Sequence, residues 1–304
     1  MNQFTINILG CGSAKPSTRH YPSCTVLNVR ENLYMVDCGE GAQMQMQRQK
    51  LRFNRLNHIF LTHLHGDHVF GLPGLLSTLS LLKREGTVTI HTFADGIRVL
   101  RDIIRYFSPI LTYDLVFNEI SPGTDLIYED RHITVRTIPL KHRLPCVGYI
   151  FEEKQKPRHL IGQMADFHQV PIAVRKDIIQ GADFIKSDGT VIPNSMLTTA
   201  PSHSASYAHI GDTSFIPKMA DKIGPVDLLY HESTYLAADL HDAAGRGHST
   251  AAQAATMAEM CGAGQLLLGH YSSRYKDLSL FLNEAREIFP NTILGFEGMR
   301  VPLI

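Results

Sequence analysis

Three histidines and one aspartate lie within six consecutive positions of the chain, in the segment 62–68, directly after an apolar stretch. His63 and His65 are two residues apart, so at the end of a strand their side chains would share one face. The glycine that follows permits a sharp reversal, which would direct Asp67 and His68 to another side of the same point. Imidazole and carboxylate ligands favour zinc, with manganese, iron or cobalt as alternatives. The segment therefore predicts ligands for two metal ions rather than a histidine-rich surface turn.

Three further ligand-type residues stand where apolar runs end, namely His142, Asp212 and His270. Open sheets present their functional side chains at such strand ends. Taken alone, each of the two histidines is more typical of an ordinary residue, and Asp212 could instead cap a helix near Pro217. Together with segment 62–68, however, the three complete the ligand set that two ions need.

The simplest assignment divides seven residues between two ions: His63, His65 and His142 on one, Asp67, His68 and His270 on the other, and Asp212 as the bridge. Each ion then has about four protein ligands and room for a shared water, as catalytic sites require. Two ions about 3.5–4 Å apart would convert that water into hydroxide at neutral pH and stabilise a phosphoryl displacement. The pattern therefore predicts metal-assisted hydrolysis.

Composition gives expectations about charge, cysteine chemistry and location. The 304 residues carry 29 basic and 29 acidic side chains, for a formal net charge of +0, so any contact with a polyanion must come from a local patch. The five cysteines show no CxxC pair and no even disulfide framework, which favours reduced thiols in the cytoplasm. A signal-type N-terminus and a run of about 18 apolar residues are both missing, so we expect a cytoplasmic protein without a membrane span.

Hydrophobic periodicity predicts an α/β protein. Strands are expected at 4–9, 25–29, 33–36, around Ile59, and at 88–93, 115–117, 133–138, 147–151, 208–211, 228–230, 266–268 and 292–296. Helices are expected at 44–52, 71–82 and 95–107, and in a longer segment that Ser249 would cap and that runs to Met260.

The two halves share this rhythm, which predicts two β-sheets packed face to face with helices outside, an αββα sandwich. Because no linker separates the halves, we expect a single domain over 1–304. Segment 152–200 is the least periodic part and is expected to form an inserted arm that binds substrate.

Several motifs resemble a known family. Segment 62–68 and the strand-end ligands resemble the metallo-β-lactamase superfamily. The chain resembles the ribonuclease Z family more closely, over nearly its whole length except segment 152–200. Members of this family are endonucleases that remove the 3′ trailer from precursor tRNA. It rests on Asp37-Cys38-Gly39-Glu40-Gly41, Gly71-Leu72-Pro73-Gly74-Leu75, Gly211-Asp212-Thr213, His231-Glu232-Ser233-Thr234, Gly247-His248-Ser249-Thr250 and Gly269-His270-Tyr271-Ser272-Ser273-Arg274-Tyr275.

The resemblance implies a metallo-β-lactamase fold, two zinc ions per subunit, a homodimer and the same seven ligands. It places the proton acceptor of the reaction at Asp67, and it makes His248 a general acid or a phosphate contact. Glu232 would orient His248 by accepting a hydrogen bond. The competing structural interpretations are that Glu232 forms an ion pair that supports the fold and that His248 is a surface loop residue.

The arm and one basic run bear on RNA binding. Family arms usually carry a Gly-Pro pair and basic residues, whereas segment 152–200 lacks that pair and has six basic and six acidic side chains, which predicts weak phosphate neutralisation. A basic run of Arg48, Lys50, Arg52 and Arg55 is equally compatible with a solvated helix face and with RNA contact.

The leading hypothesis is a zinc-dependent endoribonuclease that leaves a 3′-hydroxyl on the tRNA by attack of a metal-bridging hydroxide. A phosphodiesterase for small or cyclic nucleotide diesters is the main alternative. A hydrolase for thioesters or lactams would not need the motifs at His231 and His248. A non-catalytic RNA-binding module fits poorly with a complete ligand set.

Overall fold

The computed structural model describes residues 4–303. These residues form two compact units, a main unit of 4–152 with 205–303 and an inserted unit, Glu153–Ser204. The strands of the main unit are β1 (Phe4–Gly10), β2 (Cys24–Val29), β3 (Asn32–Val36), β4 (Leu56–Phe60), β5 (Thr87–Thr92), β6 (Asp114–Glu119), β7 (Leu126–Glu129), β8 (Ile133–Pro139), β9 (Val147–Glu153), β14 (Ser206–Ile210), β15 (Leu228–Glu232), β16 (Gln265–Gly269), β17 (Thr292–Leu294) and β18 (Arg300–Pro302). Its helices are α1 (Ala42–Arg48), α2 (Gly66–Val69), α3 (Leu72–Leu81), α4 (Ala94–Phe107), α8 (Met219–Ile223), α9 (Leu240–Arg246), α10 (Ala251–Cys261) and α11 (Ser279–Arg286), with 3-10 turns η1 (Phe53–Arg55) and η3 (Ala237–Asp239).

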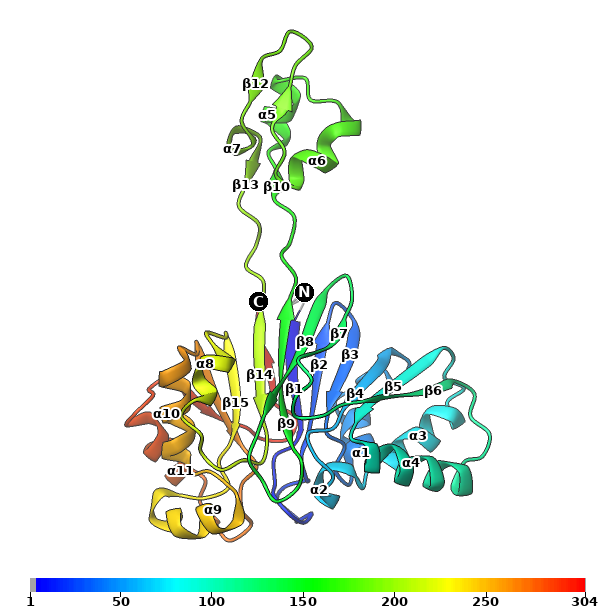
Figure 1. Ribbon diagram of the computed structural model, residues 1–304, viewed down its shortest axis with the longest axis vertical. Coiled ribbons are helices and arrows are strands. Elements are labelled where there is room, and N and C mark those ends of the chain that lie inside the picture. The colour runs from blue at the N-terminus through cyan, green and yellow to red at the C-terminus, as the bar shows by residue number, and fades with distance from the viewer. Residues whose placement is uncertain (1–3, 304) are drawn as a thin grey trace. The chain divides into compact units, whose positions relative to one another are not determined.

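Two seven-stranded sheets form the centre of the main unit, in the orders β18-β1-β2-β3-β4-β5-β6 and β17-β16-β15-β14-β9-β8-β7. Helices α3 and α4 lie outside the first sheet, and α8, α10 and α11 lie outside the second (Figure 1). This arrangement confirms the prediction of two facing sheets with helices on the outside. No helix within residues 4–303 is long and apolar enough to cross a membrane.

Side-chain alternation builds the two cores on either side of the first sheet. On β3, Tyr34 and Val36 belong to the core that contains Phe151 of the second sheet, whereas Leu33 and Met35 belong to the core beneath α3. Successive side chains of a strand point to opposite faces, so a strand buried on both faces must be apolar throughout. The continuous apolar runs in the sequence are therefore strands covered on both sides.

Parallel ladders decide where the ligand-type residues meet. Strands β3 to β6 pair in parallel, and so do β14 to β17. The carboxyl ends of parallel neighbours lie at one edge of a sheet, and side chains that follow these strands therefore gather there. Segment 62–68 follows β4, Asp212 follows β14, and His270 follows β16.

The inserted unit consists of short elements: β10 (His159–Leu160), α5 (Gly162–Phe167), η2 (Ile172–Val174), α6 (Arg175–Ile179), β11 (Phe184–Ile185), β12 (Val191–Ile192), α7 (Asn194–Leu197) and β13 (Thr198–Thr199). Its small core is built from its own residues, among them Ala165, Val170 and Ile178. Two of its cations pair with its own acids, Arg175 with Asp166 and Lys156 with Glu153. Such short elements explain the weak periodicity of this segment.

Some predicted elements differ from the structure. The helix expected over 44–52 ends at Arg48, because Lys50 adopts a left-handed backbone (φ +56°). The helix α10 is capped by Thr250, not Ser249: the Thr250 side chain accepts from the Gln253 N–H, and the Gln253 side chain accepts from the Thr250 N–H. The last parallel strand stops at Leu294 rather than 296, and β7 was not predicted.

Candidate metal centre

Four of the predicted ligands form one tight group, His63, His65, His142 and Asp212. His65 Nδ1 lies 2.9 Å from His63 Nε2 and 3.2 Å from His142 Nε2. Asp212 Oδ2 lies 3.7 Å from His63 Nε2 and 3.8 Å from His142 Nε2. Tetrahedral ligands with bonds of 2.0–2.1 Å to zinc stand about 3.4 Å apart. The spacing of these atoms therefore suits a single ion at their centre.

A second group contains the other three predicted ligands, Asp67, His68 and His270. Asp67 Oδ2 lies 3.6 Å from His68 Nε2 and 3.5 Å from His270 Nε2. Asp212 reaches this group through its other oxygen, Oδ1, which is 3.6 Å from His68 Nε2 and 3.1 Å from His270 Nε2. One carboxylate thus faces both groups, the position expected of a bridging ligand. Asp212 is not a helix cap, because α8 begins only at Met219.

The buried polar atoms of the second group lack partners, which tests whether the residues fit a cation. Within residues 4–303, His68 Nε2, His270 Nε2 and Asp212 Oδ1 are buried and have no hydrogen-bond partner. Such atoms are costly to bury unless something satisfies them. All three point to the same place, so a divalent cation there would satisfy them together.

Neighbouring groups orient the ligand rings so that one nitrogen of each is left for the cluster. Asp37 accepts from His68 Nδ1 at 2.7 Å, the Gly247 carbonyl accepts from His142 Nδ1 at 2.7 Å, and His270 Nδ1 lies 2.9 Å from Thr234 Oγ1. Partners of this kind set the tautomer and orientation of metal-binding histidines. Gly247 must be a glycine, because its φ is +75° and a Cβ would lie 2.9 Å from His142 Nδ1.

Burial controls the protonation of the first group. It lowers the pKa of His63, His65 and His142, and the neighbouring imidazoles of His65 and His68 lower that of His63 further. Neutral imidazoles keep the lone pair that a metal ion needs. Burial raises the pKa of Asp67, but His270 and His68 outweigh it and hold that pKa well below its usual range, so Asp67 is ionised.

His248 and Glu232 lie beside the second group and are hydrogen-bonded to each other. His248 Nδ1 donates to Glu232 Oε1 at 2.9 Å. Burial lowers the pKa of His248, but the charge of Glu232 outweighs it and raises the pKa to about 9. Glu232 is fully buried and also accepts from the N–H groups of Ser249 and Thr234. His248 is therefore a partly buried imidazole held by a carboxylate, not a loose surface residue.

A pocket of about 420 Å³ opens onto both groups. Besides the ligands and His248, its lining includes Phe70, Arg143, Tyr235 and Arg246. Phe70 is 72% exposed, and its ring lies against Gly66, where a Cβ would come within 2.2 Å of the ring. The rim thus presents an aromatic face and two exposed cations next to the candidate metal centre.

Sequence reasoning missed the groups that orient the ligands and those that line the pocket. Asp37 directly follows β3, so the strand-end rule used for Asp212 would also have selected it. Asp37 and His270 both adopt a left-handed backbone, with φ of +57° and +60°, which is uncommon for residues with side chains and is concentrated at functional sites. Phe70, Arg143 and Arg246 carry no such local signal.

Two family models match parts of the chain. The one described as anti-Pycsar protein Apyc1 matches residues 4–97, and the one described as a beta-lactamase superfamily domain matches residues 196–271.

Relatives match the chain over its whole length. Ribonuclease Z of Parabacteroides distasonis is 49% identical over 302 residues, which is 99% of this chain and 99% of the relative. Ribonuclease Z of Porphyromonas gingivalis is 47% identical and covers 100% of each chain. Among solved structures, human tRNase Z, short form, has a TM-score of 0.73 at 26% identity and covers 99% of both chains.

Proposed function

Because the chain belongs to the ribonuclease Z family, within the metallo-β-lactamase fold, we propose that it is a metal-dependent endoribonuclease that removes the 3′ trailer from precursor tRNA. The observation that carries the proposal is the pair of ligand groups that share Asp212. The whole-length relatives favour this activity over hydrolysis of small or cyclic nucleotide diesters.

The metal part of the proposal is two zinc ions, with His63, His65 and His142 holding one, Asp67, His68 and His270 the other, and Asp212 between them. Bound there, the ions would activate water and stabilise negative charge on the phosphate. Manganese, iron or cobalt could replace zinc, since nitrogen and oxygen ligands accept several ions. The unpartnered atoms of His68, His270 and Asp212 support occupation of the second position.

His248 acts in this proposal as the general acid. A cut that leaves a 3′-hydroxyl on the tRNA requires a proton on the departing O3′ oxygen, and His248 lines the pocket with Nδ1 held by Glu232. The raised pKa, about 9, keeps His248 protonated at neutral pH. Glu232 is thus a positioning residue that also keeps the acid charged.

Asp67 combines a ligand role with that of proton acceptor. Its Oδ2 accepts from the Ala14 N–H at 2.7 Å, which fixes the carboxylate between His68 and His270. Because its pKa is held low, Asp67 is ionised and can take the proton of the attacking water, but it would hold that proton only briefly.

The pocket rim supports a nucleotide chain as substrate. Arg143 and Arg246 are exposed cations suited to the phosphates that flank the cut, and the exposed Phe70 ring is suited to stacking of a base. The thioester and lactam groups themselves contain no phosphate for such cations to bind. The rim therefore favours a nuclease over a small-molecule acyl hydrolase.

The proposal extends to the inserted unit, to assembly and to location. Glu153–Ser204 would be the arm that binds the tRNA, although its pairs Arg175–Asp166 and Lys156–Glu153 leave fewer cations for phosphate. The sequence motifs support a homodimer, which light scattering would detect as twice the mass of the chain. A cytoplasmic location is expected for an enzyme that acts on tRNA precursors.

One assay tests the activity. An unprocessed tRNA transcript is incubated with the purified protein, with and without chelator, and the cut is mapped. We expect cleavage at the 3′ end of the tRNA body with a 3′-hydroxyl, abolished by chelator and restored by zinc. Hydrolysis of bis-p-nitrophenyl phosphate without any cut in the transcript would instead favour the small-diester alternative.

A further inference from the structure

Two cavities on the main unit lie apart from the ligand groups. The outer cavity, about 460 Å³, is lined by Lys50, Arg52, Arg55 and Arg300 among others. The middle cavity, about 680 Å³, is lined by Arg19, Arg48 and again Arg300. Gln49 and Arg300 line both cavities, so the two cavities are adjacent and share a wall, and together we call them the basic cleft.

Charge in the basic cleft is strongly one-sided. Six cationic side chains line it and only two carboxylates do, an excess of four positive charges (six minus two) in a chain whose net charge is +0. Both carboxylates are engaged, Glu31 with Arg52 at 3.9 Å and Glu297 with His20 at 3.1 Å. A concave surface with this excess attracts anions by focusing the electrostatic field.

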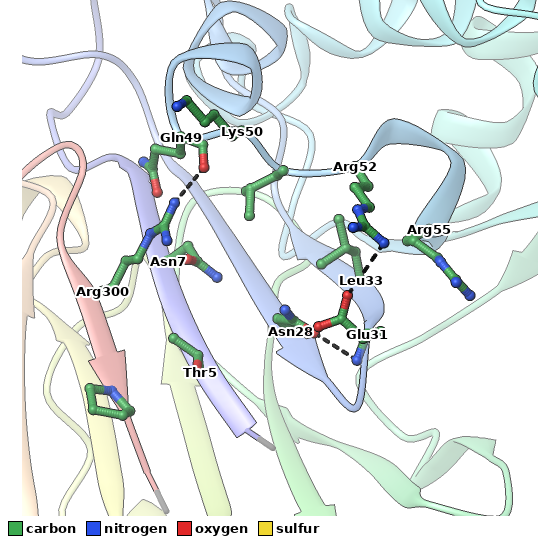
Figure 2. A pocket seen from close by; sticks show the side chains of 12 residues that line it. Thr5, Asn7, Asn28, Glu31, Leu33, Gln49, Lys50, Arg52, Arg55 and Arg300 are labelled. Atoms are coloured by element: carbon green, nitrogen blue, oxygen red, sulfur yellow. Dashed lines mark hydrogen bonds and ion pairs between the residues drawn. The ribbon is translucent and has the colours of Figure 1, made fainter. Parts of the chain in front are cut away.

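The cations are arranged around the cleft rather than along a single helix face. Figure 2 shows Arg300 on one side of the outer cavity and Arg52 and Arg55 on the other, with Thr5 and Asn7 of β1 between them. The Arg300 guanidinium donates to the Gln49 carbonyl oxygen. The solvated-helix interpretation of the basic run fails here, since α1 ends at Arg48 and the remaining cations follow it in an irregular segment and in η1.

The wall between the two cavities contains an unsatisfied acceptor. Gln49 is 7% exposed, its Nε2 donates to the Ile8 carbonyl at 2.7 Å, and its Oε1 has no hydrogen-bond partner within residues 4–303. Because Oε1 is buried, the substrate cannot reach it, and Gln49 contributes to the cleft only as the wall to which the Arg300 guanidinium donates.

The cleft is also connected to the catalytic pocket through one loop. Ser13 and Ala14 line the pocket, and Arg19 and Tyr21 of the same loop line the middle cavity. This loop is well anchored, because Arg19 donates to the carbonyls of Ser273 and Lys276, and Arg48 donates to the Tyr21 hydroxyl. A strand held in the pocket could therefore continue into the cleft along this loop.

We propose that the basic cleft binds the phosphodiester backbone of the RNA substrate outside the catalytic pocket. This inference rests on the proposed function, which supplies the RNA. In the cleft, Arg300, Lys50 and Arg55 neutralise phosphates, and Arg19 and Arg48 guide the strand between the pocket and the outer cavity.

The test removes two cations that stabilise nothing else. The side chains of Lys50 and Arg55 are exposed and make no hydrogen bond or ion pair within the described part of the chain, so the double variant Lys50→Ala/Arg55→Ala should fold normally. Its matched control is Arg105→Ala/Lys222→Ala, which removes the same charge from exposed positions on α4 and α8 outside the cleft.

For the cleft variant we expect KM for precursor tRNA to rise about 10-fold or more, with kcat and hydrolysis of bis-p-nitrophenyl phosphate unchanged. The slope of log affinity against log salt concentration should become shallower by about 1.4–1.8, since each phosphate contact contributes about 0.7–0.9. The control variant should match the wild-type protein in all of these measurements. An unchanged KM and salt slope in the cleft variant would overturn the proposal.

Two further measurements separate this proposal from others. Binding of labelled mature tRNA, measured by fluorescence anisotropy, does not require cleavage, so a wild-type protein that binds tRNA but does not cut it would refute the proposed function and leave the cleft testable. A change in oligomeric state of the cleft variant, measured by light scattering, would instead identify the cleft as an interface between copies of the chain.

Discussion

The substitution Glu232→Gln tests whether Glu232 acts through the proton of His248. The wild-type pKa of His248 is about 9, because the carboxylate 2.9 Å away outweighs the effect of burial. An amide carries no charge, so in the variant burial would be opposed only by the weaker effects of the Asp212 and Asp67 carboxylates, and the pKa of His248 should fall towards its ordinary value of about 6.5. At pH 7.5 the protonated fraction would then drop from about 97% towards about 9%, a loss of general acid that approaches about 10-fold.

The pH profile carries the decisive information. A general acid works in its protonated form, so the rate is present below its pKa and is lost as the pH rises through it. For the wild-type enzyme we expect the alkaline limb of log kcat for precursor tRNA near pH 9. For Glu232→Gln we expect that limb to move down towards pH 6.5, with a much smaller deficit at pH 5.5.

The same substitution also costs stability, which must be measured separately. The two oxygens of Glu232 accept from Thr213, Ser249 and Thr234, so an amide nitrogen must face at least one backbone donor. An unsatisfied buried donor costs about 1–3 kcal/mol, and thermal unfolding should show a lower Tm. If the Tm falls while the alkaline limb stays near pH 9, Glu232 only supports the fold and the reasoning is refuted.

A double-mutant cycle provides an independent check. His248→Ala should lower the rate by about 10²–10⁴ without loss of metal, the range for an acid–base group. If Glu232 acts through His248, adding Glu232→Gln to His248→Ala should cost almost nothing further, because both changes remove one function. Additive losses would mean that Glu232 has a separate role.

Three other perturbations have defined outcomes. Asp67→Ala should abolish turnover even in preparations where metal analysis still finds zinc, because the carboxylate between His68 and His270 is lost; near-normal cleavage by that variant would contradict its role. Phe70→Ala should raise KM for precursor tRNA about 5- to 100-fold, the value of one base–aromatic stack, and leave bis-p-nitrophenyl phosphate hydrolysis intact. Phe70→Tyr should retain wild-type behaviour, and so should the control Phe107→Ala at a side chain 75% exposed on α4; a loss as large in that control would reject the stacking role. Deleting 155–199 should abolish tRNA cleavage while hydrolysis of the small diester survives, because the core of the inserted unit is its own; retained tRNA cleavage would show that the unit does not bind substrate.

Local patterns in the sequence predicted many of the strands and helices. Alternation and apolar run length are properties of neighbouring residues, so β1, β8 and β14 were predicted to within two residues of their ends. The predictions failed where a single backbone angle or hydrogen bond decides the outcome, as at Lys50, which stops α1, and at Thr250, which caps α10 in place of Ser249.

The seven candidate ligands were identified from residue type and from their place after a strand, and the structure brings all seven together in two adjoining groups. Candidate ligands can be recognised from local sequence, because a strand places the residue that follows it at the edge of its sheet. The hydrogen-bond partners that orient these ligands could not be predicted from local sequence. The partner of His142 is the carbonyl of Gly247, 105 residues away, and the partner of His68 is Asp37.

Residue order alone determined that this chain has two facing sheets and a set of ligands suited to two divalent ions. The residues also predicted Asp212 as the bridge, and the family resemblance predicted that Glu232 orients His248. Only the tertiary structure decided which groups orient the ligand rings, such as Asp37 for His68, and that Lys50, Arg55 and Arg300 border one cleft. The physical reason is the distance along the chain over which each effect acts. Periodicity and strand ends depend on bonded neighbours, whereas charge coupling and cavities depend on distances between residues that meet only when the two sheets pack.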